Sequence, residues 1–282
     1  MNVFKNVDIS PYSYIKVGGV VDKLYIVKNE ENFIQVLNYE NNVKLIGQAS
    51  KILFAFDYDY SSYILDRNDY IKEEKDRIII GSGTPLNKIG DYFEKRGYEG
   101  FSFIRTIPGR LGGSLVQNAS CFNECVSDKL IRVKVYFNHR ITYKNKEDLA
   151  FSYRNSIFKK RGYIILGVMA LISKDKKEKI KERMREFVLL RTAKQPQLPS
   201  AGSVFKNGES FYAGKLIEEM GLKGKRVGGA MVSEKHANFI VNYKNASGKD
   251  VVKLIKEIKK MAKIKFNATL CEEVVIQWFC YT

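Results

Sequence analysis

Short apolar runs separated by loops fill much of the first eighty residues, and they constrain the fold more than any other feature. The runs lie at 23–27, 43–47, 52–56, 62–66 and 77–81. Runs of this length, bounded by turns, are typical of β-strands. Similar runs return between 131 and 171. The first part of the chain is therefore predicted to be built on β-sheets.

Helix signals interrupt the strands. Thr84 is expected to cap a helix whose first position is Pro85, because proline lacks the N–H that a first turn leaves unused. Gly97 can end that helix. A second, highly charged helix is predicted from about Lys176 to Leu190, with Phe187 on its buried face.

A smaller lobe is expected at the end of the chain. Residues 195–208 hold two of the five prolines and several small residues, so they are predicted to form a linker. Beyond it we expect a short helix ending at Gly221, a longer helix capped by Ser247, and a final strand over 272–279. The predicted fold class is α+β, with a linker and then a smaller α/β lobe.

The chain is strongly basic. Its 48 Lys and Arg and 31 Asp and Glu residues give a formal charge of +17. The basic residues are mostly scattered lysines without a nucleic-acid-binding motif, so a nucleic-acid partner is not expected. A basic surface also suits a small acidic substrate such as a nucleotide sugar or a phosphorylated cofactor. The longest apolar run, 162–172, is too short for a bilayer, so no membrane partner is expected. With no signal-peptide pattern at the N-terminus, a cytoplasmic location is predicted.

Metal binding is not expected from the cysteines and histidines. Four cysteines show no CxxC spacing, and the chain has only two histidines. Reduced thiols are predicted. His236 is expected to have a structural or substrate-facing role.

Two glycine-rich segments are candidates for a cofactor site. Gly81 and Gly83 lie between a strand and a helix start, where free backbone N–H groups bind phosphate well; a plain turn explains them equally. The segment 107–118, IPGRLGGSLVQN, has three glycines in five residues, followed by two amide side chains. That arrangement favours close approach of a flat cofactor or a pyrophosphate, ahead of a simple turn before a helix.

Charged side chains appear in otherwise apolar patterns. Residues 151–159 are predicted to form a strand, in which either Tyr153 or Arg154 faces inward; a solvent-exposed edge arginine is the alternative. Arg191 continues the buried face of the charged helix. It is either a cation aimed into a cleft, with Lys194 just beyond, or a helix C-terminal arginine that satisfies carbonyls.

Two segments near the end of the chain carry polar side chains that are candidates for a functional site. Adjacent Glu272 and Glu273 must point to opposite faces of a strand, so at most one can enter a site. The loop PSAGSVFKNG, 199–208, presents a single serine, Ser203, after small residues and before an amine and an amide.

Eight segments together resemble the UDP-N-acetylenolpyruvoylglucosamine reductase (MurB) family over nearly the whole chain. They are YIKVGG (14–19), IGQASKIL (46–53), GSGTPL (81–86), IPGRLGGSLVQNAS (107–120), YRNSIF (153–158), RTAKQPQLPSAGSVFKN (191–207), GLKGKRVGGAMVSEKHANFIVN (221–242) and LCEEV (270–274). The resemblance implies an FAD-binding lobe of the vanillyl-alcohol-oxidase (PCMH) type over 1–175, with subdomains of about 1–70 and 71–175, and a C-terminal substrate lobe over 176–282. It also implies that NADPH reduces FAD, which then reduces an enolpyruvyl nucleotide sugar to UDP-N-acetylmuramate for peptidoglycan.

The resemblance also implies roles for individual residues. Ser203 matches the proton donor, Arg154 the active-site arginine and Glu273 the active-site glutamate, whereas Glu272 does not match. The expected substrate-binding residues are Tyr153, Arg191, Lys194 and Asn207. The expected flavin-lining residues are Gly47, Ser50, Gly81, Gly83, Thr84, Pro108, Gly109, Gly113 and Asn118.

The chain departs from the family pattern in two places. The usual GGGSN is GQASK here, which keeps Gly47 and Ser50, and the usual NAGAYG is NASCFN at 118–123. The segment between Arg154 and Ser203 is short, which places the chain with members that lack an extra substrate-covering loop. A monomer with one non-covalent FAD is expected.

Two alternatives remain open at this point. The chain could be another flavoprotein of the same superfamily that oxidises a different substrate, although the substrate lobe matches as well as the flavin lobe. It could also be a non-enzymatic basic binding protein, which would be colourless when purified.

Overall fold

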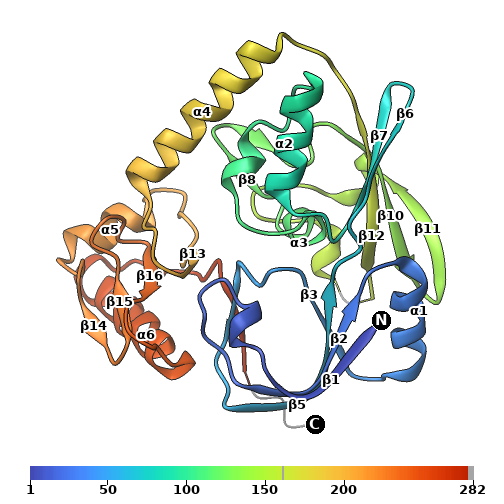
Figure 1. The fold of residues 1–282 in the computed structure, drawn as a ribbon. Coiled ribbons are helices and arrows are strands. Elements are labelled where there is room, and N and C mark those ends of the chain that lie inside the picture. Colours follow the sequence, from blue (N-terminus) through green and yellow to red (C-terminus); the bar gives the residue numbers. More distant parts are fainter. Residues whose placement is uncertain (161, 279–282) are drawn as a thin grey trace. The chain divides into compact units, whose positions relative to one another are not determined.

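The structure is a computed structural model that describes residues 1–160 and 162–278 of the chain. Helices and strands are mixed along its length, which confirms the predicted α+β class (Figure 1). The chain forms two compact units. The first unit comprises Met1–Val3, Tyr25–Gln48 and Tyr63–Arg191, and the second comprises Phe4–Leu24, Ala49–Ser62 and the residues from Thr192 onward.

The first unit contains an antiparallel sheet of five strands. Their order is β11 (Arg140–Asn145), β10 (Leu130–Phe137), β12 (Ile164–Leu171), β7 (Arg77–Gly81) and β6 (Ile71–Glu74). The unit also contains α1 (Glu30–Tyr39), α2 (Leu86–Arg96), α3 (Leu111–Val116) and the hairpin of β8 (Ser120–Cys121) and β9 (Glu124–Cys125). Apolar side chains of the sheet and of α2 share one core.

Several elements run through the division between the units. They are β1 (Asn2–Asp8), β2 (Val20–Val27), β5 (Tyr58–Asp66) and α4 (Lys177–Lys194). The three strands join β3 (Val43–Ile46) in a sheet of order β1-β2-β5-β3. The chain therefore passes between the units more than once, whereas the predicted domains follow chain order. Their boundaries at 175 and 176 stay a prediction.

The second unit contains a four-stranded sheet of order β13 (Ser200–Ser203), β16 (Phe239–Asn242), β15 (Ala230–Val232) and β14 (Arg226–Val227). It shares a core with α5 (Ala213–Glu219) and α6 (Gly248–Phe266). The predicted cap of α6 is confirmed, because Ser247 Oγ accepts from Asp250 N at 3.1 Å in a capping box. In addition, β4 (Ile52–Phe54) pairs in parallel with β17 (Val275–Gln277).

The predicted apolar runs all fall on strands, namely β2, β3, β4, β5 and β7. The sequence analysis missed α1. Its start carries a recognisable signal, since Asn29 is the N-cap and its side chain accepts from Asn32 N at 2.9 Å.

Three local predictions were wrong. The N-cap of α2 is Pro85, because the Thr84 hydroxyl donates to Tyr70 O at 3.2 Å instead of capping the helix; Gly97 ends the helix as predicted, with φ of 71°. The supposed linker 195–208 contains β13, so Ser203 lies on a strand. The final strand covers only Val275–Gln277. The predicted extension to 279 lies outside the described residues.

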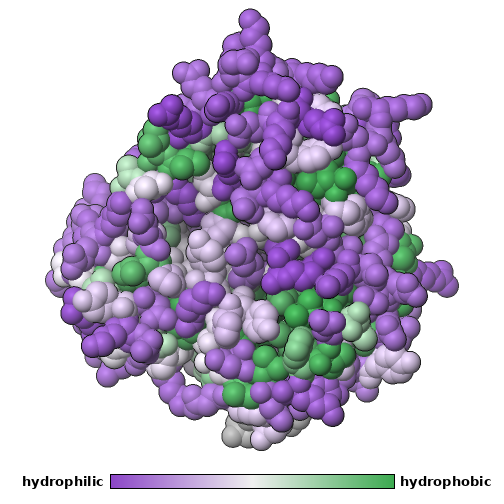
Figure 2. Space-filling model, viewed as in Figure 1, coloured by the Kyte–Doolittle hydropathy of each residue, from purple (hydrophilic) through white to green (hydrophobic). Residues whose placement is uncertain are grey.

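Hydrophilic side chains predominate on the face shown in Figure 2. Most of α4 is exposed, with Ile180 and Met184 buried. Among residues 1–160 and 162–278, no helix combines the length and apolarity that a bilayer crossing needs.

Candidate active site

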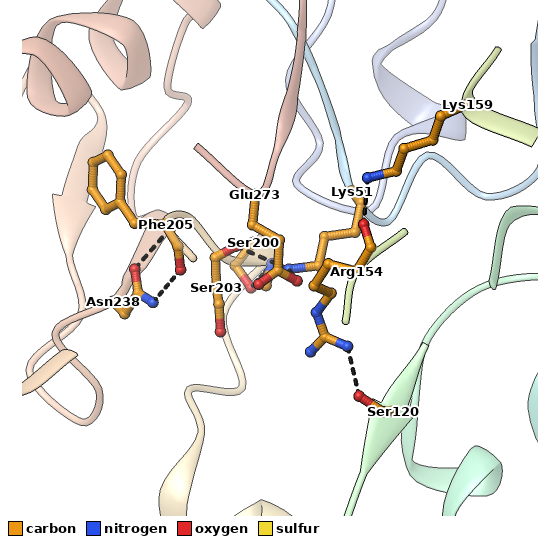
Figure 3. A network of polar contacts seen from close by, with 10 residues as sticks. Lys51, Ser120, Arg154, Lys159, Ser200, Ser203, Phe205, Asn238 and Glu273 are labelled. Carbon is orange, nitrogen blue, oxygen red and sulfur yellow. Dashed lines mark hydrogen bonds and ion pairs between the residues drawn. The ribbon is translucent and has the colours of Figure 1, made fainter. Parts of the chain in front are cut away.

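Ser203 is held firmly within the second unit. It ends β13 and pairs with Phe239 of β16. Just beyond it, Phe205 N donates to the side-chain oxygen of Asn238 at 2.9 Å, and Asn238 Nδ2 donates back to Phe205 O at 2.8 Å (Figure 3). Both backbone groups of Phe205 are thus tied to one buried amide, which fixes the chain that carries the serine.

Glu273 is a buried carboxylate with a lysine partner. Its side chain is 4% exposed, and its Oε1 lies 2.7 Å from Lys51 Nζ. The same ammonium donates to Ser203 O at 2.9 Å. In Figure 3 the hydroxyl of Ser203 points away from the Glu273 carboxylate, so the lysine joins these two residues through the backbone of Ser203.

The two adjacent glutamates diverge, as the sequence analysis predicted. Glu272 pairs with Lys259 of α6 at 2.7 Å and is partly exposed. Of the two, it is Glu273 that pairs with Lys51, the lysine that donates to Ser203 O.

Two predicted substrate-binding residues have different surroundings. The side-chain oxygen of Asn207 accepts from Ala213 N at 3.1 Å, which satisfies a free N–H at the start of α5. The amide nitrogen of Asn207 is a separate donor, and the residue is exposed. Lys194 is exposed at the end of α4.

His236 has a structural environment. Its Nδ1 accepts from Asn238 N at 3.2 Å, and burial lowers the pKa of the imidazole. Within the part of the chain that the structure describes, no group of three or more His, Cys, Asp or Glu side chains is arranged to hold a metal. The described cysteines, Cys121, Cys125 and Cys271, are free thiols; Cys280 lies outside the described residues.

In the first unit, the two glycine-rich segments lie side by side. Three backbone hydrogen bonds join them: Gly112 N to Ser82 O (2.8 Å), Leu111 N to Thr84 O (3.0 Å) and Leu86 N to Gly109 O (3.1 Å). Gly109 has φ of 141°, a backbone conformation that favours glycine. The pairing brings the predicted flavin-lining glycines of both segments into one region of the unit.

The N–H groups of the first segment are already engaged. Ser82, Gly83 and Thr84 donate to carbonyl oxygens of the same unit at 3.1, 3.0 and 3.1 Å. The free N–H groups assumed in the phosphate hypothesis are therefore absent at these three positions. A cofactor phosphate bound here would need other donors.

Two arginines can supply such donors. Burial and the like charge of Arg67 lower the pKa of Arg110 to about 10. Arg110 Nη1 donates to Gly83 O, and Arg67 Nη1 donates to Gly47 O at 3.4 Å. Among the described residues, buried Arg110 Nε has no hydrogen-bond partner. Two nearby guanidiniums beside predicted flavin-lining glycines suit a bound anion.

The second glycine-rich segment is open at Gly113. A Cβ added there would meet nothing within 4 Å. Close in sequence, the side-chain oxygens of Gln117 and Asn118 are buried without a partner among the described residues, while Asn118 Nδ2 donates to Ser152 O at 3.3 Å. Open space and unused acceptors fit a ligand that has hydrogen-bond donors.

Arg154 lies on a tight turn, so the predicted strand over 151–159 was wrong. Ser152 and Asn155 form an isolated bridge, and Arg154 between them has φ of 53°. Its Nη1 donates to Ser120 Oγ at 2.8 Å, and its carbonyl oxygen accepts from Lys159 Nζ (Figure 3). The orientation of the guanidinium is therefore set by this turn and not by the alternation of side chains along a strand.

Tyr153 and Arg191 are the remaining predicted substrate-binding residues. Tyr153 is 58% exposed, and the Arg154 guanidinium lies 5.3 Å from its ring centre. Arg191 is half-buried near Cys121, where its charge opposes the rise in thiol pKa that burial causes. Arg191 thus faces other groups of the first unit, in agreement with the predicted face of the helix.

Lys51 and Ser120 are contact residues that the sequence analysis did not select. Lys51 contacts both Glu273 and Ser203, and Ser120 accepts from Arg154. Both lie in the two segments where the chain departs from the family pattern, GQASK and NASCFN. Those departures were the available signal. Ser50, predicted to line the flavin, directly precedes Lys51 in the second unit.

Comparisons with known proteins agree with this organisation. Residues 194–277 match the family described as UDP-N-acetylenolpyruvoylglucosamine reductase, C-terminal domain. The reductase of that name from Thermotoga petrophila is 37% identical over 275 residues, covering 96% of this chain and 97% of the relative. The one from Thermosipho melanesiensis is 39% identical over 265 residues, covering 93% and 91%.

A solved structure extends the similarity to the fold. The crystal structure of UDP-N-acetylenolpyruvylglucosamine reductase (MurB) from Thermus caldophilus matches with a TM-score of 0.87 and 31% identity, covering 98% of this chain and 99% of the other. The α+β architecture thus belongs to a known class of reductase folds. The chain belongs to the UDP-N-acetylenolpyruvoylglucosamine reductase family.

Proposed function

We propose that this protein is an NADPH-dependent flavoenzyme that reduces UDP-N-acetylenolpyruvoylglucosamine to UDP-N-acetylmuramate, a peptidoglycan precursor. The observation that carries the proposal is the arrangement around Ser203. The chain that carries the serine is fixed by two hydrogen bonds between the Asn238 side chain and the Phe205 backbone, which we call the Asn238 clamp. Lys51 links the carbonyl oxygen of Ser203 to the buried Glu273. This arrangement lies in a chain that is similar over nearly its full length to a UDP-N-acetylenolpyruvoylglucosamine reductase.

FAD is the proposed cofactor, because the first unit offers groups that fit it. Arg67 and Arg110 would hold its phosphates, and the open backbone at Gly113 would allow close approach. The unused acceptors of Gln117 and Asn118 would bind donors of the flavin ring. Bound FAD supplies hydride transfer. The other proposed flavin-lining residues are Gly47, Ser50, Gly81, Gly83, Thr84, Pro108 and Gly109.

Ser203 is the proposed proton donor to the substrate. Addition of hydride to one carbon of an enol ether leaves enolate-like charge on the neighbouring carbon, which a positioned acid must protonate. An alcohol is a weak acid, so its position matters more than its acidity. The strand pairing to Phe239 and the clamp at Phe205 supply that position.

Arg154 and Glu273 complete the proposed catalytic set. The planar guanidinium of Arg154 would hold the substrate carboxylate and spread the developing charge. Ser120 fixes one of its nitrogens, which orients the others. Glu273, which pairs with Lys51, would orient the substrate or relay a proton.

Four residues are proposed to bind the nucleotide sugar: Tyr153, Arg191, Lys194 and Asn207. Their charges and donors suit diphosphate and sugar oxygens. We also propose that the protein is a monomer in the cytoplasm, with no membrane or nucleic-acid partner. The predicted domains, 1–175 for FAD and 176–282 for the substrate, are part of the same proposal.

Stopped-flow absorbance of the flavin tests the proposal through its two half-reactions. The enzyme is mixed first with NADPH and then with the enolpyruvyl nucleotide. We expect Ser203→Ala to leave flavin reduction nearly intact and to slow reoxidation by about a hundred- to ten-thousand-fold. Ser203→Cys should recover part of the loss, since a thiol also donates a proton.

Two results would contradict this proposal. Equal reoxidation rates in the wild type and Ser203→Ala would remove Ser203 from the mechanism. A purified protein that binds no FAD on reconstitution would end the flavoenzyme proposal altogether.

A further inference from the structure

Lys51 joins its own segment of the second unit to two others that are far away in the sequence, around Ser203 and around Glu273. Its Nζ lies 2.7 Å from Glu273 Oε1 and donates to Ser203 O at 2.9 Å. Its own carbonyl oxygen accepts from Val275 N at 2.8 Å. One residue therefore contacts the strand that carries the serine, the buried glutamate and the segment that follows the glutamate.

The fold places Lys51 here through backbone pairing. β4 and β17 are parallel, with Ile52 opposite Val275, so the residue before β4 comes next to the residues that precede β17. Glu273 N donates to Val204 O at 2.7 Å, which ties the glutamate to the residue directly after Ser203 as well. The backbone pairing brings Ser203 and Glu273 together, and the side chain of Lys51 then contacts both residues.

Gly202 provides room for the lysine side chain. A Cβ added to Gly202 would lie 3.1 Å from Lys51 Nζ and 3.3 Å from its Cε. Gly202 also has φ of 71°, which a residue with a side chain adopts only at a cost. The small residue before Ser203 therefore serves the packing of Lys51 in this chain.

The burial of Glu273 makes its contact with Lys51 important. The Glu273 side chain is 4% exposed, whereas that of Lys51 is 29% exposed. A buried carboxylate is costly unless a positive charge and hydrogen bonds compensate it, and an ammonium has three N–H groups to donate. Lys51 can therefore compensate the buried Glu273 carboxylate and fix the Ser203 carbonyl with the same group.

We propose that Lys51 is a positioning residue for the reductase reaction, which acts by fixing Glu273 and the backbone of Ser203 relative to each other. The proposal rests on the proposed function of those two residues. The lysine itself need not touch the substrate. Its removal should therefore affect the step that uses Ser203 and Glu273, and it should matter little once Glu273 has lost its charge.

A double-mutant cycle tests this coupling. Wild type, Lys51→Met, Glu273→Gln and the double variant are compared for flavin reduction by NADPH and for reoxidation by the enolpyruvyl nucleotide. Misplacing a reacting group by about 1 Å can cost about a hundred-fold in rate. We expect Lys51→Met to slow reoxidation by that order while flavin reduction stays within about two-fold, and to slow it far less when Glu273→Gln is already present. Lys51→Arg should restore part of the rate, since it keeps the charge.

Lys259→Met is the matched control. It removes the same charge from the ion pair with the adjacent Glu272, at the same distance of 2.7 Å but with more exposed side chains. We expect it to change neither half-reaction by more than about two-fold, as for an exposed ion pair. Lys51→Met and Lys259→Met effects of equal size, or additive effects of Lys51→Met and Glu273→Gln, would overturn the proposal.

Unfolding in urea gives a second readout that does not depend on turnover. The urea midpoint of Lys51→Met should fall because the carboxylate loses its partner, and the double variant should regain part of that loss. A double variant that is no more stable than Lys51→Met would contradict the link. If Lys51→Met does not fold, the double variant compared with Glu273→Gln carries the same test. A wild type that cannot reduce the nucleotide would refute the proposed function alone, because the urea cycle still tests the Lys51 contact.

Discussion

The two glycine-rich segments of the first unit look alike in sequence and differ in what they surround. A Cβ on Gly83 would lie 2.3 Å from Asn68 N and 2.5 Å from Asp66 Oδ1, and one on Gly81 would lie 2.2 Å from Asn68 O. A Cβ on Gly113 would meet no atom within 4 Å. Gly81 and Gly83 of the first segment need to be glycine because neighbouring atoms of the chain pack directly against them. Gly113 of the second segment has free space beside its backbone.

This difference separates a structural glycine from a candidate ligand-binding one. In the first segment, Ser82, Gly83 and Thr84 use their N–H groups within the unit. In the second, unused acceptors of Gln117 and Asn118 follow the open glycine. Close approach to a cofactor is therefore better supported at Gly113 than at Gly81 or Gly83.

The strongest test of this comparison is Gly83→Ala. The added Cβ would overlap backbone and carboxylate atoms that have no flexible end to move. We expect the free energy of unfolding to fall by about 3 kcal/mol or more, at the upper end of overpacking effects. Urea denaturation followed by circular dichroism measures it. Wild-type stability in this variant would mean that the first segment is not a packing requirement.

A second test concerns Asp66, whose carboxylate Gly83 accommodates. Burial raises the pKa of Asp66 to about 6 from 3.8. Because the folded value is raised, the stability that this group contributes is fully present below the unfolded pKa and is lost as pH rises through about 6. The free energy of unfolding of Asp66→Asn minus that of wild type should therefore increase by roughly 2 kcal/mol as the pH rises from about 4 to about 8.

The measurement for Asp66→Asn is the difference in unfolding free energy between variant and wild type at several pH values. Asparagine keeps an oxygen that can accept from Asn68 N, which Asp66 does at 2.9 Å. Taking the difference removes the contributions of groups common to both proteins. A difference that does not vary with pH would contradict the expected titration.

The smallest expected effect is that of Gly113→Ala, and its sign is opposite to that of Gly83→Ala. Gly113 lies within α3, where alanine favours the helix by about 0.5–1 kcal/mol and meets no obstacle. We expect the protein without flavin to become slightly more stable, while FAD affinity falls because the methyl group fills the open face. Fluorescence titration of the apoprotein with FAD measures that loss. Unchanged FAD affinity would show that the cofactor does not approach Gly113.

The sequence by itself determined the local structure where short-range physics decides it. Apolar runs gave the strands β2, β3, β4, β5 and β7, and Ser247 and Gly97 marked helix ends that the structure confirms. These signals depend on side-chain period and on backbone groups at helix ends, which a few neighbouring residues settle. The family resemblance rested on the same kind of continuous motif.

Only the tertiary structure decided how the polar side chains are held. Arg154 was expected on a strand, but its turn is stabilised against Ser152, Asn155 and the distant Ser120. Lys51 meets Ser203 across 152 positions and Glu273 through the parallel pairing of β4 with β17. An ion pair or hydrogen bond forms between groups that the fold brings within about 3 Å. No local pattern specifies that meeting, because it depends on sheet register and burial set by the whole chain.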